Sequence, residues 1–170
     1  NELLSIVDKN NEEVRRATRK EVHENFLLHR EVYAYVLNNK KQLLLQKRSD
    51  NNLWDHAVGG HFPFNQNYLQ AAQREFEEEL GIKLGEKDFS PLGVHKIVSE
   101  HNNQREQRLA GVFLVKKDIP LRKFKIDAGE LKQVKYFSKQ ELLELISSKQ
   151  KTLAPTCRQV LKKFILKQLD

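Results

Sequence analysis

The segment from Gly59 to Ile82 constrains the fold of this chain more than any other stretch. A glycine pair, Gly59–Gly60, follows two apolar residues, and a run of apolar and acidic residues ends at Gly81. At 100° per residue, four apolar side chains of residues 68–80 fall on one arc of about 80°. They are Leu69, Ala72, Phe76 and Leu80. The spacing predicts an amphipathic helix over residues 68–80 that buries this stripe and ends at the glycine.

Three carboxylates share a second face of this helix. Glu75, Glu78 and Glu79 have i, i+3 and i+4 spacing, with Arg74 as a local counter-charge that can orient one of them. Like charges this close repel, and the helix dipole disfavours negative charge in the last turns. A divalent cation reverses the repulsion, because Mg²⁺ and Mn²⁺ prefer oxygen ligands. The pattern fits either a solvated acidic face or a cation site, and the glycine pair, which permits close backbone approach, favours the site.

The flanking sequence predicts more strands than helices. Strand-like segments rich in β-branched, aromatic or other apolar residues cover 3–7, 14–18, 31–37, 42–46, 57–58, 92–99, 109–115 and 134–137. The first two predict a hairpin within an N-terminal extension, residues 1–28. Thr18 and Glu21 have the spacing of a capping box, which indicates a short helix or loop after that hairpin. Residues 49–55 and 100–108 are expected to be loops.

Two more helices are expected near the C-terminus. Ser138 and Glu141 predict a capped helix over 140–146, and Pro155 begins a final amphipathic helix within 155–170. The order of elements is not a regular βαβ alternation. It therefore predicts one α+β domain over residues 1–170, with helices packed on a mixed sheet.

Composition narrows the classes of protein. The chain has 170 residues, 39% of them hydrophobic and 31% charged, which fits a soluble globular domain. No apolar run reaches the ~18–20 residues of a membrane span, so no membrane partner is expected. Because the chain begins at Asn1 and contains no methionine, we expect that its original start was removed. The single cysteine, Cys157, fits a reducing cytoplasm and is expected to be a packed thiol rather than a nucleophile.

The net charge of +7 suits an anionic partner such as a nucleotide, a prenyl diphosphate or RNA. The lysines are scattered, and no basic stripe interleaved with aromatic residues stands out. A nucleic-acid partner is therefore compatible with the sequence but not favoured.

The segment 59–82 resembles the Nudix box, G-x5-E-x7-R-E-U-x-E-E-x-G-U, in which U is a bulky aliphatic residue. Gly60 matches its first position, and 74–82 match its end if Phe76 serves as the bulky residue. Gln66 stands where the box has its first glutamate. Over residues 2–146 the chain is similar to the Nudix branch related to isopentenyl-diphosphate isomerase. The resemblance implies a Nudix-like α/β/α sandwich, a mixed sheet between helices, preceded by the hairpin.

The resemblance also implies the roles of individual residues. It assigns Mg²⁺ or Mn²⁺ binding to Glu75, Glu78, Glu79 and the carbonyl of Gly60, and makes the three glutamates with Arg74 the catalytic group. A box glutamate, or one from a later loop, acts as general base for water. Glu100 or Glu106 is a candidate for that further ligand or base, and a surface loop carboxylate is the alternative.

Basic and histidine side chains supply further candidates. Arg30, Lys47 and Arg48 are candidate phosphate ligands, and since neighbours on a strand face opposite ways, at most one of the last two is expected to point inward. His29 and His61 match metal-binding histidines of the isomerase branch, and His23 is displaced by about one residue from the third. A second site for Mn²⁺ or Zn²⁺ is one interpretation, and polar loop histidines are the other.

The leading hypothesis is a cytoplasmic, metal-dependent hydrolase. Water would attack phosphorus in a nucleoside diphosphate derivative or another X-linked diphosphate, with Gln66 slowing turnover. A homodimer is compatible with such a fold. The second hypothesis is an isopentenyl-diphosphate isomerase, but that chemistry needs a cysteine and a glutamate where this chain has Gly59 and Arg108. The third is a catalytically weak Nudix module that binds nucleotide or RNA.

Overall fold

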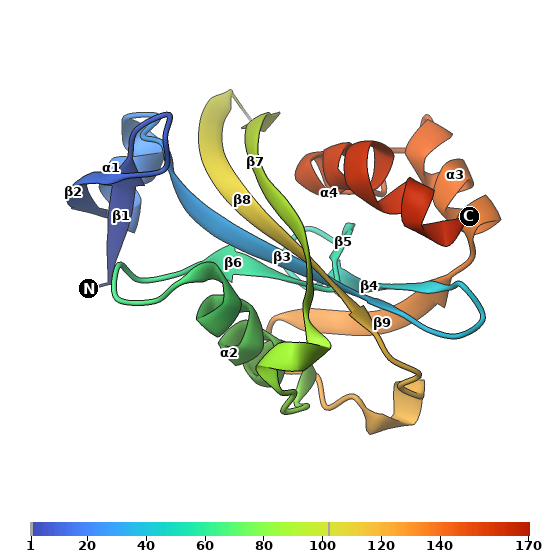
Figure 1. The fold of residues 1–170 in the computed structure, drawn as a ribbon. Helices are drawn as coiled ribbons and strands as arrows, with labels where there is room; N and C mark the ends of the chain where they lie inside the picture. Colours follow the sequence, from blue (N-terminus) through green and yellow to red (C-terminus); the bar gives the residue numbers. More distant parts are fainter. Residues whose placement is uncertain (1, 102) are drawn as a thin grey trace.

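The computed structural model describes residues 2–101 and 103–170, and its centre is a nine-stranded mixed sheet (Figure 1). The central strand β3 (His29–Leu37) pairs in parallel with β8 (Gln104–Lys116) and antiparallel with β6 (Val58–His61). β8 also pairs with β7 (Ser90–His101), and β4 (Leu43–Arg48) joins β3 to β5 (Trp54–His56) and β9 (Leu131–Phe137). The other two strands, β1 (Leu3–Val7) and β2 (Glu13–Thr18), join β3 through β1. These mixed directions confirm the α+β prediction.

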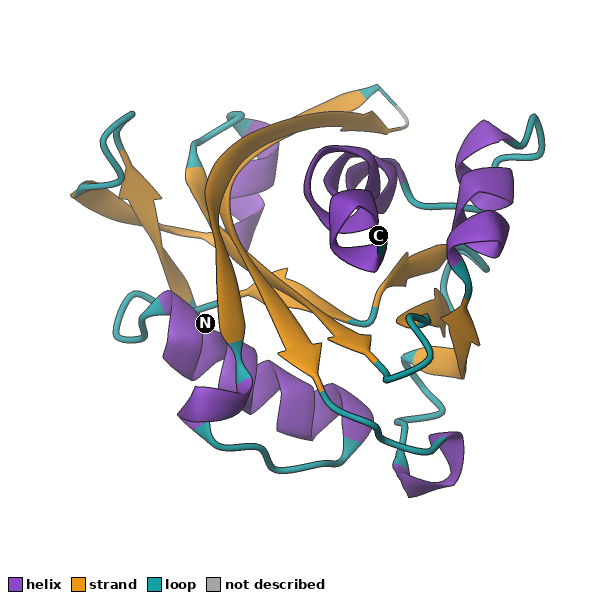
Figure 2. Ribbon diagram, turned by 45° about the vertical axis from the view of Figure 1, so that its right-hand side comes forward, coloured by secondary structure: helices purple, strands orange, loops and turns teal. Residues whose placement is uncertain are grey.

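Helices cover both faces of this sheet, and the alternation of side chains along β3 shows how (Figure 2). Val32, Ala34 and Val36 join one hydrophobic cluster with α2 (Tyr68–Leu80). The odd-numbered residues from Tyr33 to Leu37 join a second cluster with α3 (Lys139–Ser147) and α4 (Pro155–Val160). Because successive side chains on a strand point to opposite faces, one strand supplies both cores. The predicted α/β/α sandwich is confirmed.

The N-terminal extension forms the expected hairpin. Strands β1 (Leu3–Val7) and β2 (Glu13–Thr18) pair antiparallel and are followed by α1 (Arg19–Glu24). Thr18 Oγ1 accepts a hydrogen bond from the Glu21 backbone N–H at 3.3 Å, and the Thr18 N–H donates back to the Glu21 carboxylate, so the capping box is present. This extension has a small core of its own, made of Leu4, Ile6, Ala17 and Val22.

The loops expected at 100–108 and 49–55 are both wrong in part. Strands β7 and β8 pair until His101 faces Gln104, so the polar segment is a hairpin end. Its polar residues are tolerated because they bind one another across the strands, as Arg108 Nη1 does with Ser99 Oγ at 3.0 Å. The segment 49–55 ends in strand β5, and Trp54 of that strand also forms a β-bridge with Leu153.

The C-terminal helix changes its winding along its length. After α4 the chain continues as a π-helical segment, Leu161–Ile165, and a 3₁₀ segment, Leu166–Leu169, rather than as the single α-helix expected. Its buried apolar residues include Val160, Leu161, Ile165 and Leu169, and Phe164 packs against them partly buried. Two single 3₁₀ turns, Glu86–Asp88 and Leu121–Lys123, lie in connections. Among the described residues, no helix has the length and apolar character that crossing a membrane requires. The cytoplasmic location and the homodimer stay predictions.

Candidate active site

A cleft of about 860 Å³ opens beside helix α2 and strand β6, which carries the glycine pair. Its lining contains three arginines, Arg19, Arg48 and Arg74. It also contains nine carboxylates, namely Glu2, Glu31, Asp50, Asp55, Glu75, Glu78, Glu79, Asp127 and Glu130. Nine acidic and three basic groups give the cleft a formal charge of −6, although the whole chain carries +7. An anionic ligand would therefore be repelled unless cations entered with it.

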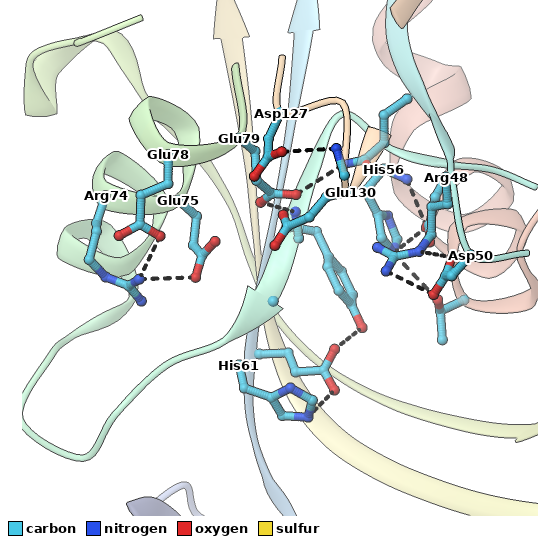
Figure 3. A pocket seen from close by; sticks show the side chains of 18 of the residues that line it. Arg48, Asp50, His56, His61, Arg74, Glu75, Glu78, Glu79, Asp127 and Glu130 are labelled. Carbon is cyan, nitrogen blue, oxygen red and sulfur yellow. Dashed lines mark hydrogen bonds and ion pairs between the residues drawn. The ribbon is translucent and has the colours of Figure 1, made fainter. Parts of the chain in front are cut away.

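Helix α2 positions the box carboxylates at this cleft. Asn67 caps the helix by accepting a hydrogen bond from the Gln70 backbone N–H at 2.8 Å, and the C-cap Gly81 is left-handed with φ 72°. The predicted limits of the helix, 68–80, are confirmed. Its apolar face is buried under the sheet, and Glu75 and Glu79 point from the adjacent face into the cleft (Figure 3).

Glu79 is the most deeply buried of the three box glutamates, with 6% of its surface exposed. Its Oε1 accepts a hydrogen bond from Gln46 Nε2 at 3.1 Å, and its Oε2 accepts one from the Gly59 backbone N–H at 3.3 Å. Burial raises the pKa of Glu79 well above its usual range, and the neighbouring Glu75 raises it further. Burial also raises the pKa of Glu75, against the opposing effect of Arg74.

This pair of carboxylates fits a divalent cation. Two desolvated acids side by side resist ionisation, and a bound cation would favour their charged forms. Gly60 lies against the same pair, since a Cβ on it would be 3.4 Å from Glu75 Oε1. Mg²⁺ and Mn²⁺ favour oxygen donors of this kind, and a backbone carbonyl can join them.

Arg74 organises the outer side of the box. Its Nη1 lies 3.1 Å from Glu75 Oε1 and 3.1 Å from Glu78 Oε2. Its Nε donates a hydrogen bond to Gln66 Oε1 at 3.0 Å. Gln66, the residue that departs from the box, therefore orients the arginine through a neutral oxygen. Glu78 is the most exposed of the three box glutamates and stays at the rim of the cleft.

Only Arg48 of the three predicted phosphate ligands reaches the cleft. It is held there by Asp50, with Nε to Oδ1 at 3.0 Å and Nη2 to Oδ2 at 3.2 Å. The Lys47 ammonium lies 5.5 Å from the centre of the Trp54 ring and is not part of the cleft lining. Arg30 binds Asn11 in the N-terminal hairpin, at 2.9 and 2.8 Å, so the structure does not place it with the phosphate ligands.

Several cleft residues were missed by the sequence analysis. Arg19 comes from the start of α1, while Asp127 and Glu130 come from the connection before β9. Gln46 directly follows the apolar run Leu43–Leu45. This polar residue at the end of a buried strand is the one sequence signal that could have identified it. Figure 3 shows Arg48 and Asp50 across the cleft from the box glutamates of α2. These residues are distant in sequence, so only the folded sheet brings them together.

Two of the expected histidines meet Glu106 next to the cleft. Nε2 of His23 lies 3.0 Å from Oε1 of Glu106, and Nε2 of His61 lies 3.3 Å from Oε2 of Glu31, so each of these atoms faces a partner of opposite charge type. Each of these residues offers a ligand atom within 4.8 Å of the others. Burial lowers the pKa of His61 to about 4, against the opposing effect of Glu31, so its ring is neutral at physiological pH. Two imidazoles and a carboxylate are a donor set that fits Zn²⁺ or Mn²⁺. Glu100, the alternative to Glu106, is not among these ligands.

Arg108 occupies the other side of this cluster. Its Nε lies 3.1 Å from Glu31 Oε2 and its Nη2 lies 3.1 Å from Glu106 Oε2. Burial alone would raise the pKa of Glu31, but His61, His29 and Arg108 hold it well below its usual range. Both ring nitrogens of His29 face oxygens, Leu27 O at 3.0 Å and Glu31 Oε2 at 3.1 Å. His29, Glu31 and His61 offer ligand atoms within 4.8 Å of one another, so metal binding by His29 stays a prediction.

Two further positions bear on catalysis, Cys157 in the core and Gly59 in the wall of the cleft. Cys157 is fully buried beside Tyr35, whose hydroxyl lies 3.8 Å from the sulfur. Burial raises the pKa of the Cys157 thiol well above its usual range, so the thiolate does not form near neutral pH. Gly59 is closely packed, since a Cβ on it would be 3.2 Å from the Tyr33 ring and 3.3 Å from the His56 ring.

Comparisons with known proteins agree with this geometry. The family model of the NUDIX domain matches residues 27–164. "Nudix hydrolase 3" of Arabidopsis thaliana is 33% identical over 81% of this chain, which spans only 19% of that longer protein. "Isopentenyl-diphosphate Delta-isomerase 1" of Mesocricetus auratus is 28% identical over 99% of this chain and 85% of its own length. An uncharacterized Nudix hydrolase of Listeria monocytogenes is 32% identical over 71% of this chain and 70% of its own length.

Solved structures share the fold. The protein DR0079 of Deinococcus radiodurans superposes with a TM-score of 0.76 at 20% identity, over 96% of this chain and 99% of that one. The NUDIX domain of Shewanella oneidensis NrtR, complexed with ADP ribose, superposes with a TM-score of 0.60 at 16% identity, over 78% and 83%.

Proposed function

Because this chain belongs to the Nudix family, we propose that it is a metal-dependent hydrolase of a diphosphate linkage. The observation that carries the proposal is the buried pair Glu75 and Glu79, held beside Gly59–Gly60 in a cleft of charge −6. A diphosphate cannot approach nine carboxylates closely without divalent cations to offset the repulsion. Glu75, Glu79 and the carbonyl of Gly60 would hold Mg²⁺ or Mn²⁺ there, and the ion would supply positive charge that offsets the charge of the phosphates.

The chain's own residues have distinct parts in this proposal. Glu75 and Glu79 would hold the cation, while Gly59 and Gln46 orient Glu79 through the hydrogen bonds already described. Arg74 keeps Glu78 beside the site, where its carboxylate is a candidate base for water. Arg48 would contact a substrate phosphate in exchange for Asp50, because a phosphate accepts the same paired hydrogen bonds from a guanidinium.

We infer the substrate class more broadly than a single compound. A nucleoside diphosphate derivative fits the proposal, and the structural neighbour complexed with ADP ribose is an example of such a ligand in this fold. The cleft of about 860 Å³ has room for a group of that size. A second cation, Zn²⁺ or Mn²⁺, is proposed at His23, His61 and Glu106, since their three ligand atoms lie within 4.8 Å of one another.

Isomerase activity is the second candidate, because several relatives are isopentenyl-diphosphate isomerases by name. Two observations in this chain oppose it. Gly59 replaces the cysteine expected by resemblance and is packed against Tyr33 and His56. Arg108 replaces the glutamate and is bound to Glu31 and Glu106. Neither position offers a group that exchanges a proton with carbon.

A phosphate-release assay over a panel of nucleoside diphosphate derivatives with Mg²⁺ tests the proposal. We expect turnover by the unsubstituted protein, loss of it with Glu79→Gln, and retention with Glu77→Gln, an exposed neighbour on the same helix. Tight nucleotide binding without turnover on any compound would favour the binding module. Proton exchange into isopentenyl diphosphate would instead favour the isomerase.

A further inference from the structure

Gln46 is a buried amide in the wall of the cleft. It lies on β4 with 2% of its surface exposed, at the end of the run Leu43–Leu45. Alternation along the strand places it on the same face as Leu44, toward α2. Burying an amide is costly unless its polar atoms have partners, so the partners of both ends of this side chain matter.

The orientation of the amide is determined by its nitrogen. Gln46 Nε2 donates to the Ala57 carbonyl at 3.0 Å and to Glu79 Oε1 at 3.1 Å. Both partners are oxygen acceptors when Glu79 is ionised, so exchanging the nitrogen and oxygen of the amide would bring oxygens against oxygens. The carbonyl oxygen is therefore fixed at the other position.

That oxygen, Gln46 Oε1, is buried and has no hydrogen-bond partner among the described residues. An unsatisfied buried acceptor destabilises the fold, because it has lost its hydrogen bonds to water. The residue lines the cleft, so a ligand in the cleft can supply the missing donor. With nine carboxylates around the same space, the species attracted there is a cation with its hydration water.

We propose that Gln46 Oε1 accepts a hydrogen bond from a water ligand of the divalent cation bound by Glu79. This inference rests on the proposed function, since it concerns the same cation. Mg²⁺ and Mn²⁺ usually keep several waters when bound to protein, and each such water is a strong donor. Gln46 is then a positioning residue that holds the carboxylate with its nitrogen and the hydration shell with its oxygen.

Mn²⁺ binding, followed by the electron paramagnetic resonance of the free ion, tests this without turnover. We expect Gln46→Met to weaken binding by roughly 10- to 100-fold, the usual effect of removing an outer-shell partner. Gln73→Met is the matched control, because Gln73 Nε2 also donates to a carbonyl, Leu84 O at 2.7 Å, but lies outside the cleft. Equal affinity in Gln46→Met and the unsubstituted protein would overturn the inference.

A second measurement isolates the oxygen from the nitrogen and needs no variant. In the unsubstituted protein, the NMR shift of the Gln46 side-chain carbonyl carbon should move downfield on addition of Mg²⁺, while that of Gln73 stays in place. A Gln46 carbonyl that is insensitive to Mg²⁺ would show that the amide acts only through its nitrogen. Failure of the unsubstituted protein to bind Mn²⁺ at all would instead refute the proposed function, and this inference with it.

Discussion

Glu79 combines deep burial with surroundings that disfavour its ionised form. Its raised pKa has burial as its main cause, and both of its oxygens already accept hydrogen bonds. The protein thus holds a carboxylate in a place where the anion alone is unfavourable. Such an arrangement favours cation binding, because the cation offsets the cost of ionisation.

The first prediction concerns Glu79→Gln. Removing this ligand should lower kcat/KM by about a hundredfold or more, which corresponds to roughly 3 kcal/mol of lost charge stabilisation. It should also abolish the stabilisation by Mg²⁺, which for the unsubstituted protein is about 2.7 kcal/mol at a hundredfold excess over Kd. Thermal unfolding with and without Mg²⁺ measures the second effect, with Glu77→Gln as the control. Equal stabilisation of Glu79→Gln and the unsubstituted protein would place the cation elsewhere.

The second prediction concerns Gln66→Glu, which restores the first glutamate of the box. Gln66 already orients Arg74 through its oxygen, and a glutamate would only strengthen that contact by about 0.5–1 kcal/mol. We therefore expect Gln66→Glu to change kcat by less than about fivefold. Gln66→Leu removes the acceptor of the Arg74 hydrogen bond and should lower kcat by a larger factor. A much larger gain from Gln66→Glu would show that the missing carboxylate is itself a ligand.

At the scale of single residues, the sequence predicted which glutamates of the box come together. It did not predict which side chains line the opposite wall of the cleft. Glu75 and Glu79 could be placed together because helical spacing is a local property. Asp127, Glu130 and Arg19 could not, since they reach the cleft through connections whose paths depend on the whole sheet. Arg30 was misplaced for a related reason. It neighbours Glu31 on β3, and alternation turns the two side chains to opposite faces.

Among the elements, α2 is the one whose ends matter most for the site. Gly81 ends it in the left-handed region, φ 72°, and a Cβ there would be 2.6 Å from Lys125 Cβ. Gly81→Ala should destabilise the protein by roughly 2 kcal/mol or more, from backbone strain of about 1–2 kcal/mol and the clash. Gly85→Ala is the control, since Gly85 has φ −82° and its nearest contact would be at 3.7 Å.

Denaturant unfolding measures both substitutions. Similar losses for Gly81→Ala and Gly85→Ala would mean that the C-cap does not constrain α2. A loss of stability in Gly81→Ala that is accompanied by weaker Mg²⁺ binding would link the end of the helix to the position of Glu79, two residues before it.

The elements themselves show which physical signals act locally. The 3.6-residue period and Gly81 predicted α2, and the Ser138–Glu141 capping box predicted α3, where that box is present. The polar segment 100–108 resembled a loop, because its strand character depends on Arg108 finding Ser99 and Glu106 across the hairpin. The parallel pairing of β3 with β8 is equally non-local, and no short-range pattern specifies it.

At the scale of the whole molecule, charge is strongly partitioned. The cleft carries −6 within a chain of +7, so the rest of the protein carries +13. The basic exterior can attract an anionic substrate from a distance, whereas the cleft accepts its phosphates only with cations. Polar contacts of Arg108, His23 and His61 join α1, β3, β6 and β8 next to this cleft.

The last prediction follows from His61. Its pKa is about 4 in the folded protein and 6.5 in the unfolded chain, so the unfolded state binds the proton more tightly. The stability associated with the neutral ring is present above pH 6.5 and is lost as the pH falls toward 4, by about 3 kcal/mol in total. The difference in unfolding free energy between His61→Gln and the unsubstituted protein reports on His61 together with its contact to Glu31, whose Oε2 lies 3.3 Å from the ring. That difference, measured by urea unfolding without metal, should shift by about 3 kcal/mol in favour of His61→Gln between pH 7 and pH 4. A constant difference would show that the ring is protonated as readily in the folded cluster as in water.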